Sequence, residues 1–392
     1  MLFRSYTDSD EFCGEVCHVV MEPEYTTYKN SAHNKVGCVK CHIGSGADWY
    51  VKSKMSGLYQ VYAVLTNNYA RPIPTPLHNL RPAQETCEQC HSPRHFYDEK
   101  KIERDYYLYD SANSHFNLTM HIKVGGGNLE FGNNSGIHWH MNRANEIHYI
   151  ASDKSNQVIP WVRSKSNATG KETVYRLVGE NLSQEDIRPE NMKLFDCIDC
   201  HNRPAHKYNP PDKIVNLYMK MNRINPRIPF IKSIAVQALE SINSEHKDAI
   251  KDINAFIWNY YNNLFPNLEP GLKKSINQAI EELAIIYSRN YFPHMKANWK
   301  IYPDNIGHLY SPGCFRCHDG KHVNENGKIL TNDCNACHTF QTEFIPSVGD
   351  SLKTTGKTIV NDFVHPGGAD KKIKEQNRSE ERRVGKECRS RW

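Results

Sequence analysis

The sequence has few hydrophobic residues and no long apolar run. Only 39% of its 392 residues are hydrophobic, and no stretch reaches the roughly 18 apolar residues that a membrane-spanning helix needs. The first twelve residues, MLFRSYTDSDEF, also lack the apolar segment of an export signal. Side chains alone therefore offer little apolar material for the two or three domains that this length allows.

Charge of one sign is also scarce. Lys and Arg number 49 and Asp and Glu number 44, which gives a formal net charge of +5. Part of this small excess comes from residues 377–392, which end in RSEERRVGKECRSRW and resemble translated adapter or vector read-through. We therefore expect no nucleic acid partner, because the sequence lacks the strongly basic balance that such binding needs. Residues 371–392 are expected to be a non-native tail.

Unpaired cysteines are almost missing, because twelve of the thirteen cysteines form six pairs that are each followed directly by a histidine. In chain order the motifs are Cys13/Cys17/His18 (motif 1), Cys38/Cys41/His42 (motif 2), Cys87/Cys90/His91 (motif 3), Cys197/Cys200/His201 (motif 4), Cys314/Cys317/His318 (motif 5) and Cys334/Cys337/His338 (motif 6). Motifs 2 to 6 follow C-x-x-C-H, in which two thioethers hold a porphyrin and the histidine ligates its iron. Zinc or a disulfide could explain one C-x-x-C, but not a histidine after every second cysteine.

The sequence thus predicts six covalently bound haem c groups, each with one iron. Large apolar porphyrins can fill the interior that side chains leave short, so we expect the protein not to fold properly without them. Because this type of haem attachment takes place outside the cytoplasm, we expect the holoprotein to face the periplasm.

A haem iron has a second axial position, and its occupant separates electron transfer from substrate chemistry. Histidines outside the motifs that lie near a motif or near each other are the predicted ligands: His33, His138, His140, His206, His308 and His322. His138 and His140 share one face of the segment IHWH if it is a strand. The alternative for each is an ordinary hydrogen-bonding histidine, and the spacing pairs none of them with a motif. Two histidines on one iron leave no open position for a substrate, which favours electron relay.

Motif 1 differs from the others, since its cysteines have one extra residue between them and Met21 follows soon after His18. A thioether on the iron would raise the reduction potential relative to two histidines. Met21 is therefore a candidate ligand, and packing against the porphyrin is its alternative.

The sequence predicts a mainly α fold, an irregular multihaem cytochrome c built around stacked haems, with a small antiparallel β insertion. Residues 1–104 contain three motifs, and prolines at every second position in 71–82 favour an extended linker. Residues 105–195 contain short β-branched or aromatic runs such as EIHYIA and TVYRLV between polar or Gly-rich turns. Residues 196–370 contain the other three motifs and form the predicted C-terminal helical domain.

Apolar residues recur at helical spacing in two segments of this last domain. One stripe comprises Ile231, Ile234, Ala235, Ala238, Leu239 and Ile242, and the other comprises Leu272, Ile276, Ala279, Ile280 and Leu283. Pro266, Pro270 and Gly271 lie between them and separate the two helices. The pattern predicts two long helices in an antiparallel hairpin.

With these motifs in place, residues 6–91 resemble the NapC/NirT family of multihaem quinol dehydrogenases, which includes NrfH-like members. The resemblance rests on the motif spacing, on His33 within SAHNKVGC, on Met21 after motif 1 and on RPIPTPLHNLRP before motif 3. In the family pattern C-x-x-C-H-x-M, the cysteines and the Met are each one residue closer. The remainder of the chain resembles larger members that add further haems.

The resemblance implies quinol oxidation at motif 1, with menaquinol as the expected quinol, and an N-terminal anchor in the inner membrane that precedes this sequence. It implies transfer of electrons to periplasmic or outer-membrane cytochromes or reductases. Quinol oxidation releases protons, so a base or polar anchor is needed nearby. Asp48, Lys52 and Lys54 lie where relatives place such residues, and an ordinary solvated face is the alternative.

Two other functions stay open on the sequence. One is a multihaem reductase of a small nitrogen or sulfur oxyanion, which needs one haem with an open axial position. The other is a soluble periplasmic electron wire without quinol contact. A wholly low-spin spectrum would exclude the reductase, and reduction by a menaquinol analogue would exclude the wire without quinol contact.

Overall fold

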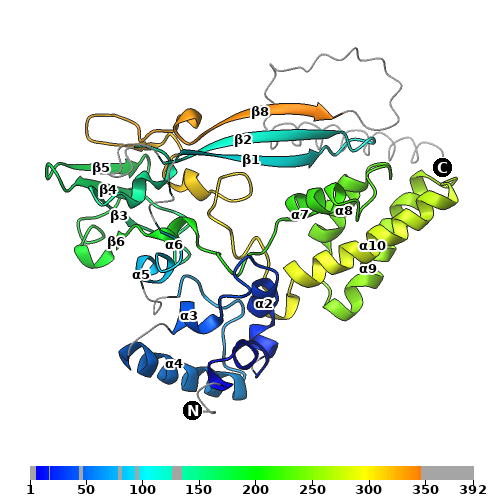
Figure 1. Ribbon diagram of the computed structural model, residues 1–392, viewed down its shortest axis with the longest axis horizontal. Coiled ribbons are helices and arrows are strands. Elements are labelled where there is room, and N and C mark those ends of the chain that lie inside the picture. Colours follow the sequence, from blue (N-terminus) through cyan, green and yellow to red (C-terminus); the bar gives the residue numbers. More distant parts are fainter. Residues whose placement is uncertain are drawn as a thin grey trace. The chain divides into compact units, whose positions relative to one another are not determined.

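The computed structural model describes residues 6–345 apart from residues 17, 44–46, 78–81, 93–95, 97 and 126–134, and its side chains apart also from residues 18–19, 47–50, 52 and 341–345. Helices make up 41% and strands 16%, with two antiparallel sheets of three and five strands (Figure 1). The predicted mainly α fold is therefore wrong. Strands from far outside residues 105–195 join these sheets, namely β7 (His322–Val323) and β8 (His338–Ile345).

The chain forms two compact units, each assembled from segments that are distant in sequence. Unit 1 comprises Met1–Lys100, Ile122–Tyr208 and Arg289–His338. Unit 2 comprises Lys101–His121, Asn209–Ser288 and the chain from Thr339 onward. All six motifs fall within unit 1. The domain limits expected from the sequence stay a prediction.

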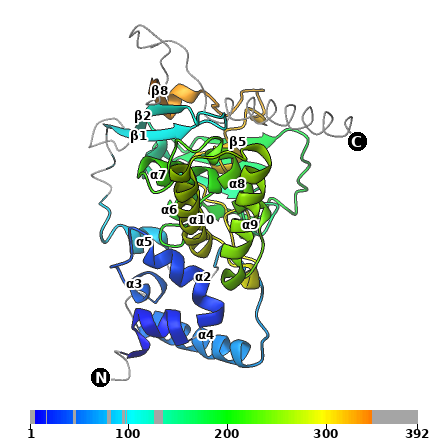
Figure 2. The ribbon, with the colours of Figure 1, turned by 90° about the vertical axis from the view of Figure 1, so that its right-hand side faces the viewer.

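Each motif of unit 1 lies on or beside a short helical turn, which places its residues close together in space. These turns are the π-helix η1 (Phe12–Val16) with α2 (His18–Lys29), then α3 (Cys38–His42), α5 (Ala83–Cys87), α6 (Cys197–Cys200), η6 (Gly313–Arg316) and η7 (Cys334–Ala336). The longer helix α4 (Ala47–Leu65) lies between motifs 2 and 3 in the chain, and α2 to α5 are seen in blue in Figure 2. No helix in the described parts of the chain is long and apolar enough to cross a membrane.

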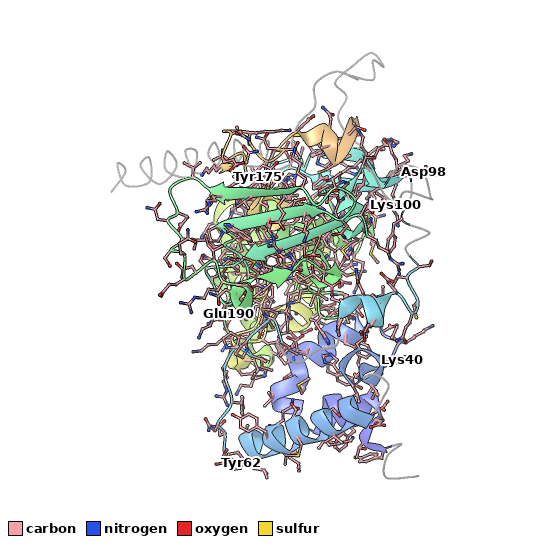
Figure 3. The ribbon with its side chains drawn as sticks, turned by 90° about the vertical axis from the view of Figure 1, so that its left-hand side faces the viewer. Lys40, Tyr62, Asp98, Lys100, Tyr175 and Glu190 are labelled. Carbon is pink, nitrogen blue, oxygen red and sulfur yellow. The ribbon has the colours of Figure 1, made fainter. Side chains whose placement is uncertain are left out.

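A five-stranded antiparallel sheet in unit 1 supports motifs 4 and 5. Its order is β6 (Lys193–Leu194), β3 (Asn145–Ile150), β4 (Trp161–Ser166), β5 (Glu172–Leu177) and β7. Figure 3 shows this sheet with Tyr175 on β5, which pairs with Val162 on β4. Ile147, Tyr149, Ile159 and Val162 form its small core, against which Phe195 and Cys317 pack. The core therefore contacts a residue just before motif 4 and a cysteine of motif 5.

Unit 2 contains the helices α7 (Pro211–Lys220), α8 (Ile231–Ser241), α9 (His246–Leu264) and α10 (Pro270–Asn290), and most of the sheet β1 (Asp98–Tyr107), β2 (His115–Gly125) and β8. Both predicted apolar stripes are helical, in α8 and α10. The two-helix prediction is wrong, however, because Pro266 and Pro270 separate α10 from α9, which was not predicted. The buried residues of α9 are four apart, at Ala249, Ile253, Ile257 and Tyr261, and many polar residues lie between them.

Lys232 of α8 is a fully buried cation, with 0% of its surface exposed. Its Nζ donates to the Asp212 backbone oxygen at 2.6 Å and to Asn216 Oδ1 at 2.7 Å, and lies 2.9 Å from Asp212 Oδ1. We expect Lys232→Ala to lower the free energy of unfolding by about 3–5 kcal/mol, because it removes the cation beside a partly buried carboxylate. Chemical denaturation of the holoprotein measures this loss.

The matched control is Lys220→Ala, which removes a half-exposed lysine that pairs with Asp105. Exposed ion pairs contribute about 0–1 kcal/mol, so this variant should unfold nearly as the wild type does. Equal losses in the two variants would contradict the role of Lys232.

Candidate haem sites

Five motif histidines each lie opposite one histidine from outside the motifs. The pairs, with the distance between ring centroids, are His42 and His206 (6.1 Å), His91 and His33 (6.1 Å), His201 and His138 (6.4 Å), His318 and His140 (5.8 Å), and His338 and His308 (6.1 Å). Metal–imidazole bonds are about 2.0–2.1 Å long, as for zinc, so two imidazoles on opposite sides of one metal ion have centroids roughly 6 Å apart. Each pair therefore fits a single iron between its rings.

Hydrogen bonds to the Nδ1 atoms orient four of the non-motif rings. Nδ1 lies 2.8 Å from Glu24 O in His206, 3.0 Å from Pro204 O in His33, 3.1 Å from Val124 O in His138 and 2.9 Å from Ile137 O in His140. A backbone carbonyl only accepts, so Nδ1 carries the hydrogen and Nε2 keeps a lone pair for a metal. Burial also lowers the pKa of His138 and His140, which favours the neutral ring.

The segment IHWH is a 3₁₀ helix, η3 (Ile137–Met141), and not a strand. With three residues per turn, side chains two positions apart point in different directions. The ring of His138 accordingly lies opposite His201 of motif 4, and that of His140 lies opposite His318 of motif 5. One helical turn thus contributes to two candidate haem sites.

At motif 1 the described part is η1, which contains Cys13. Gly14 is buried there because the Tyr25 ring occupies the space of a Cβ, at 2.3 Å from its ideal position. Cys17 and the side chain of His18 lie outside the described residues. Met21 is half-buried in α2, so its role as a ligand stays a prediction.

The family model for the N-terminal region of the NapC/NirT cytochrome c family matches residues 2–74. The cytochrome c-type protein ImcH of Geobacter sulfurreducens is 44% identical over 361 residues, which cover 92% of this chain and 69% of ImcH. The chain belongs to the NapC/NirT cytochrome c family. The cytochrome c-type protein NrfH of Wolinella succinogenes is 31% identical over 91 residues, which cover 22% of this chain and 51% of NrfH. No solved structure matches the chain.

The predicted resemblance to the NapC/NirT family is thereby confirmed. Membership in a cytochrome c family means that the chain binds haem c covalently and takes part in electron transfer. The cysteine pairs and the opposed histidines fit such groups at the motifs of this NapC/NirT protein.

His322, the sixth predicted ligand, has a different surrounding. It is fully buried, with 0% exposure, its Nδ1 lies 2.8 Å from Asp319 Oδ1 and its Nε2 lies 2.7 Å from Ile159 O. Hydrogen bonds occupy both ring nitrogens, so His322 has no lone pair directed at a metal. It holds β7 against the five-stranded sheet.

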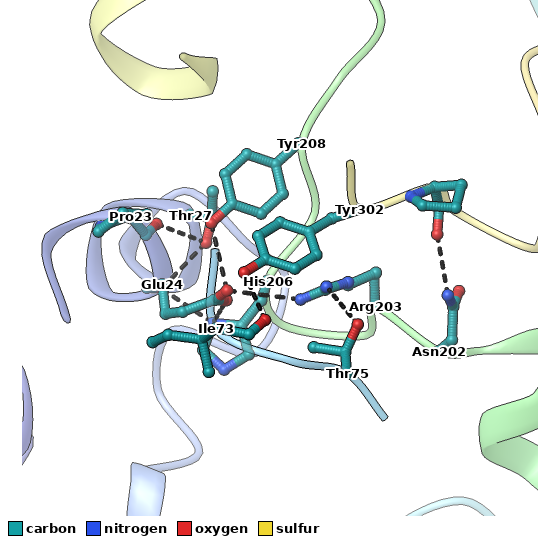
Figure 4. A network of polar contacts seen from close by, with 11 residues as sticks. Pro23, Glu24, Thr27, Ile73, Thr75, Asn202, Arg203, His206, Tyr208 and Tyr302 are labelled. Carbon is teal, nitrogen blue, oxygen red and sulfur yellow. Dashed lines mark hydrogen bonds and ion pairs between the residues drawn. The ribbon is translucent and has the colours of Figure 1, made fainter. Parts of the chain in front are cut away.

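A polar network that the sequence did not predict fixes the His42–His206 pair (Figure 4). Arg203 lies 3.5 Å from Glu24 Oε1, and both side chains are largely buried, at 7% and 15% exposure. The Tyr208 hydroxyl donates to Glu24 Oε1 at 3.3 Å, and the Arg203 guanidinium lies 4.0 Å above the Tyr302 ring. These contacts join the loop after motif 4 to the helix after motif 1. Sequence spacing gave no signal for them, since the partners are far apart in the chain.

The predicted quinol residues lie on α4. The side chains of Asp48 and Lys52 lie outside the described residues. Lys54 extends toward the N-terminal segment, with Nζ 3.3 Å from Asp8 Oδ1 and 3.4 Å from Thr7 Oγ1. The quinol site stays a prediction.

Proposed function

We propose that this cytochrome holds six haem c groups, one at each motif, and that five of them have two histidine ligands. The observation that supports this most directly is the five opposed ring pairs with centroids 5.8–6.4 Å apart. The second ligands are His206 at motif 2, His33 at motif 3, His138 at motif 4, His140 at motif 5 and His308 at motif 6.

Bound haem supplies the one-electron iron couple. The protein's own residues hold the group by two thioethers, fill both axial positions, and fix the imidazole planes through carbonyls such as Glu24 O and Pro204 O. Two imidazoles leave no position for a substrate, so these five sites favour electron relay over catalysis.

We further propose the direction of transfer, from membrane menaquinol at motif 1 to periplasmic or outer-membrane cytochromes or reductases, on the periplasmic face of the inner membrane. Support comes from the family match, whose residues 2–74 include motif 1 and α4. Asp48, Lys52 and Lys54 are proposed to accept the protons and anchor the quinol beside motif 1.

The test uses protein matured in a host that assembles c-type cytochromes. We expect a mass that corresponds to six haems, an electron paramagnetic resonance spectrum that is low-spin for five irons, and reduction by a menaquinol analogue. High-spin signals from more than one iron that bind added cyanide would refute the paired histidines and favour an oxyanion reductase. A low-spin protein that the analogue does not reduce would refute the quinol assignment alone.

A further inference from the structure

Motifs 1 and 2 are held together by Asp10, three residues before Cys13. Its Oδ1 accepts from the backbone N–H of Cys38 at 2.8 Å, and its Oδ2 accepts from the Tyr28 hydroxyl at 2.6 Å. A hydrogen bond between the two thiols lowers the pKa of Cys13 to about 7. The first cysteines of the two motifs are therefore direct neighbours.

Motif 2 leads to motif 3 through His33. This histidine is five residues before Cys38, and its ring lies opposite His91. Motif 3 leads to motif 4 through Asp196, whose side chain accepts from the backbone N–H of Ala83, at the start of α5, at 2.9 Å. The same carboxylate accepts from the N–H of Cys197 at 2.6 Å and caps α6.

Motifs 4 and 5 are joined twice. The first link is η3, whose His138 and His140 lie opposite one histidine of each motif. The second is Arg316, between the cysteines of motif 5, which is buried with 7% exposure. Its guanidinium donates to Asp199 O, between the cysteines of motif 4, at 2.5 Å, and to Asn156 O at 2.8 Å. A buried cation that is held by carbonyls fixes the two motifs against each other.

Motifs 5 and 6 are joined by an aromatic stack. The Phe315 ring, between the cysteines of motif 5, lies 4.1 Å from that of His308 at an interplanar angle of 12°. His308 in turn lies opposite His338 of motif 6. The candidate second ligand of motif 6 thus rests on motif 5.

Electrostatic effects between cysteines follow the same order. Burial and then the charge of Cys90 raise the pKa of Cys41, so motifs 2 and 3 are close. Charges from the preceding motif also raise the pKa of one cysteine in motif 4 and of one in motif 6, after burial, through Cys87 on Cys197 and Cys314 on Cys337. Each effect joins motifs that are consecutive in the sequence.

We infer that the six motifs form one unbranched file in sequence order, with motif 1 and motif 6 at its two ends. This inference rests on the proposed function and adds the route to it. Electrons that arrive at motif 1 pass every other site before they leave from motif 6, so the partner that accepts them docks near η7. Asp10, Asp196, Arg316 and Phe315 are the positioning residues that hold consecutive motifs together.

The decisive measurement is the position of the six irons in the mature holoprotein, by anomalous diffraction at the iron edge or by cryo-electron microscopy. We expect the nearest neighbours of every iron to belong to the preceding and following motifs. An iron whose nearest neighbour belongs to a non-consecutive motif would overturn the file. Irons that lack the paired histidines would instead refute the proposed function, and the same map shows which idea has failed.

A kinetic comparison tests the order independently, with low-potential reductant delivered at motif 1. Cys334→Ala with Cys337→Ala removes an end of the file, and the other five haems should be reduced at the wild-type rate. Cys197→Ala with Cys200→Ala removes an interior member, and two haems should then be reduced at least tenfold more slowly. Rapid reduction of all five remaining haems in the interior variant would show a branch and overturn the proposal. The iron map decides the matter if that variant does not fold.

Discussion

His206→Ala is expected to convert the iron at motif 2, and no other, from low-spin to high-spin. The ring of His206 lies 6.1 Å from that of His42, and its Nδ1 is fixed by Glu24 O at 2.8 Å. Alanine removes one of two strong-field ligands, so the iron becomes five-coordinate and binds added carbon monoxide. Electron paramagnetic resonance and the carbon monoxide difference spectrum each measure the change as one haem in six.

His206→Met gives the graded form of the same result. A thioether keeps the iron six-coordinate but favours its reduced state, so the potential of that haem should rise on the order of 0.1 V, a fraction of the roughly 0.8 V range that axial ligands control. Spectroelectrochemical titration resolves the shifted component from the other five.

The matched control is His322→Ala, which also removes a half-buried or buried histidine of unit 1. Both nitrogens of His322 are already hydrogen-bonded, to Asp319 and to Ile159 O. Its loss should lower the free energy of unfolding by about 1–3 kcal/mol, because buried acceptors lose their donor, and leave the spin states unchanged. A high-spin iron in His322→Ala together with a wild-type spectrum in His206→Ala would reverse the ligand assignment.

The sequence predicted the chemistry of the sites but not their pairing. His33 precedes motif 2 and lies opposite His91 of motif 3, His206 follows motif 4 and lies opposite His42 of motif 2, and His308 precedes motif 5 and lies opposite His338 of motif 6. A histidine a few residues from a motif is held on the same side as that motif's own histidine. It therefore reaches the far face of a different porphyrin, and only the three-dimensional fold decides which one.

The β content was underestimated for a related reason. The runs EIHYIA and TVYRLV were read as strands and correspond to β3 and β5. The sheet is completed by His322 and Val323, which pair with Leu177 and Arg176. Two residues have no periodicity of their own, and tertiary pairing decides their state. Local pattern thus predicted the strands within the insertion but not those that join from elsewhere.

Gly313→Ala is expected to destroy the site at motif 5. Gly313 directly precedes Cys314 and has φ +48°, a left-handed conformation that costs a residue with a side chain about 1–2 kcal/mol. An added Cβ would lie 1.7 Å from Gly307 O and 2.9 Å from Asn305 O. Both are backbone atoms and cannot rotate away, so η6 must move together with Phe315 and Arg316. We expect a loss of at least about 3 kcal/mol in the free energy of unfolding and protein with fewer than six haems.

Gly307→Ala separates this close approach from backbone strain. Gly307 lies in the same loop and also has a positive φ, +83°, but no atom lies within 4 Å of the position of an added Cβ. Only the left-handed penalty of about 1–2 kcal/mol applies there, so the haem content should stay complete. Mass spectrometry and denaturant unfolding of both variants give the comparison. If Gly313→Ala keeps six haems and matches Gly307→Ala in stability, the loop does not close on motif 5. The contacts of Arg316 and Phe315 with the neighbouring motifs would then lose their structural basis, because η6 presents both side chains.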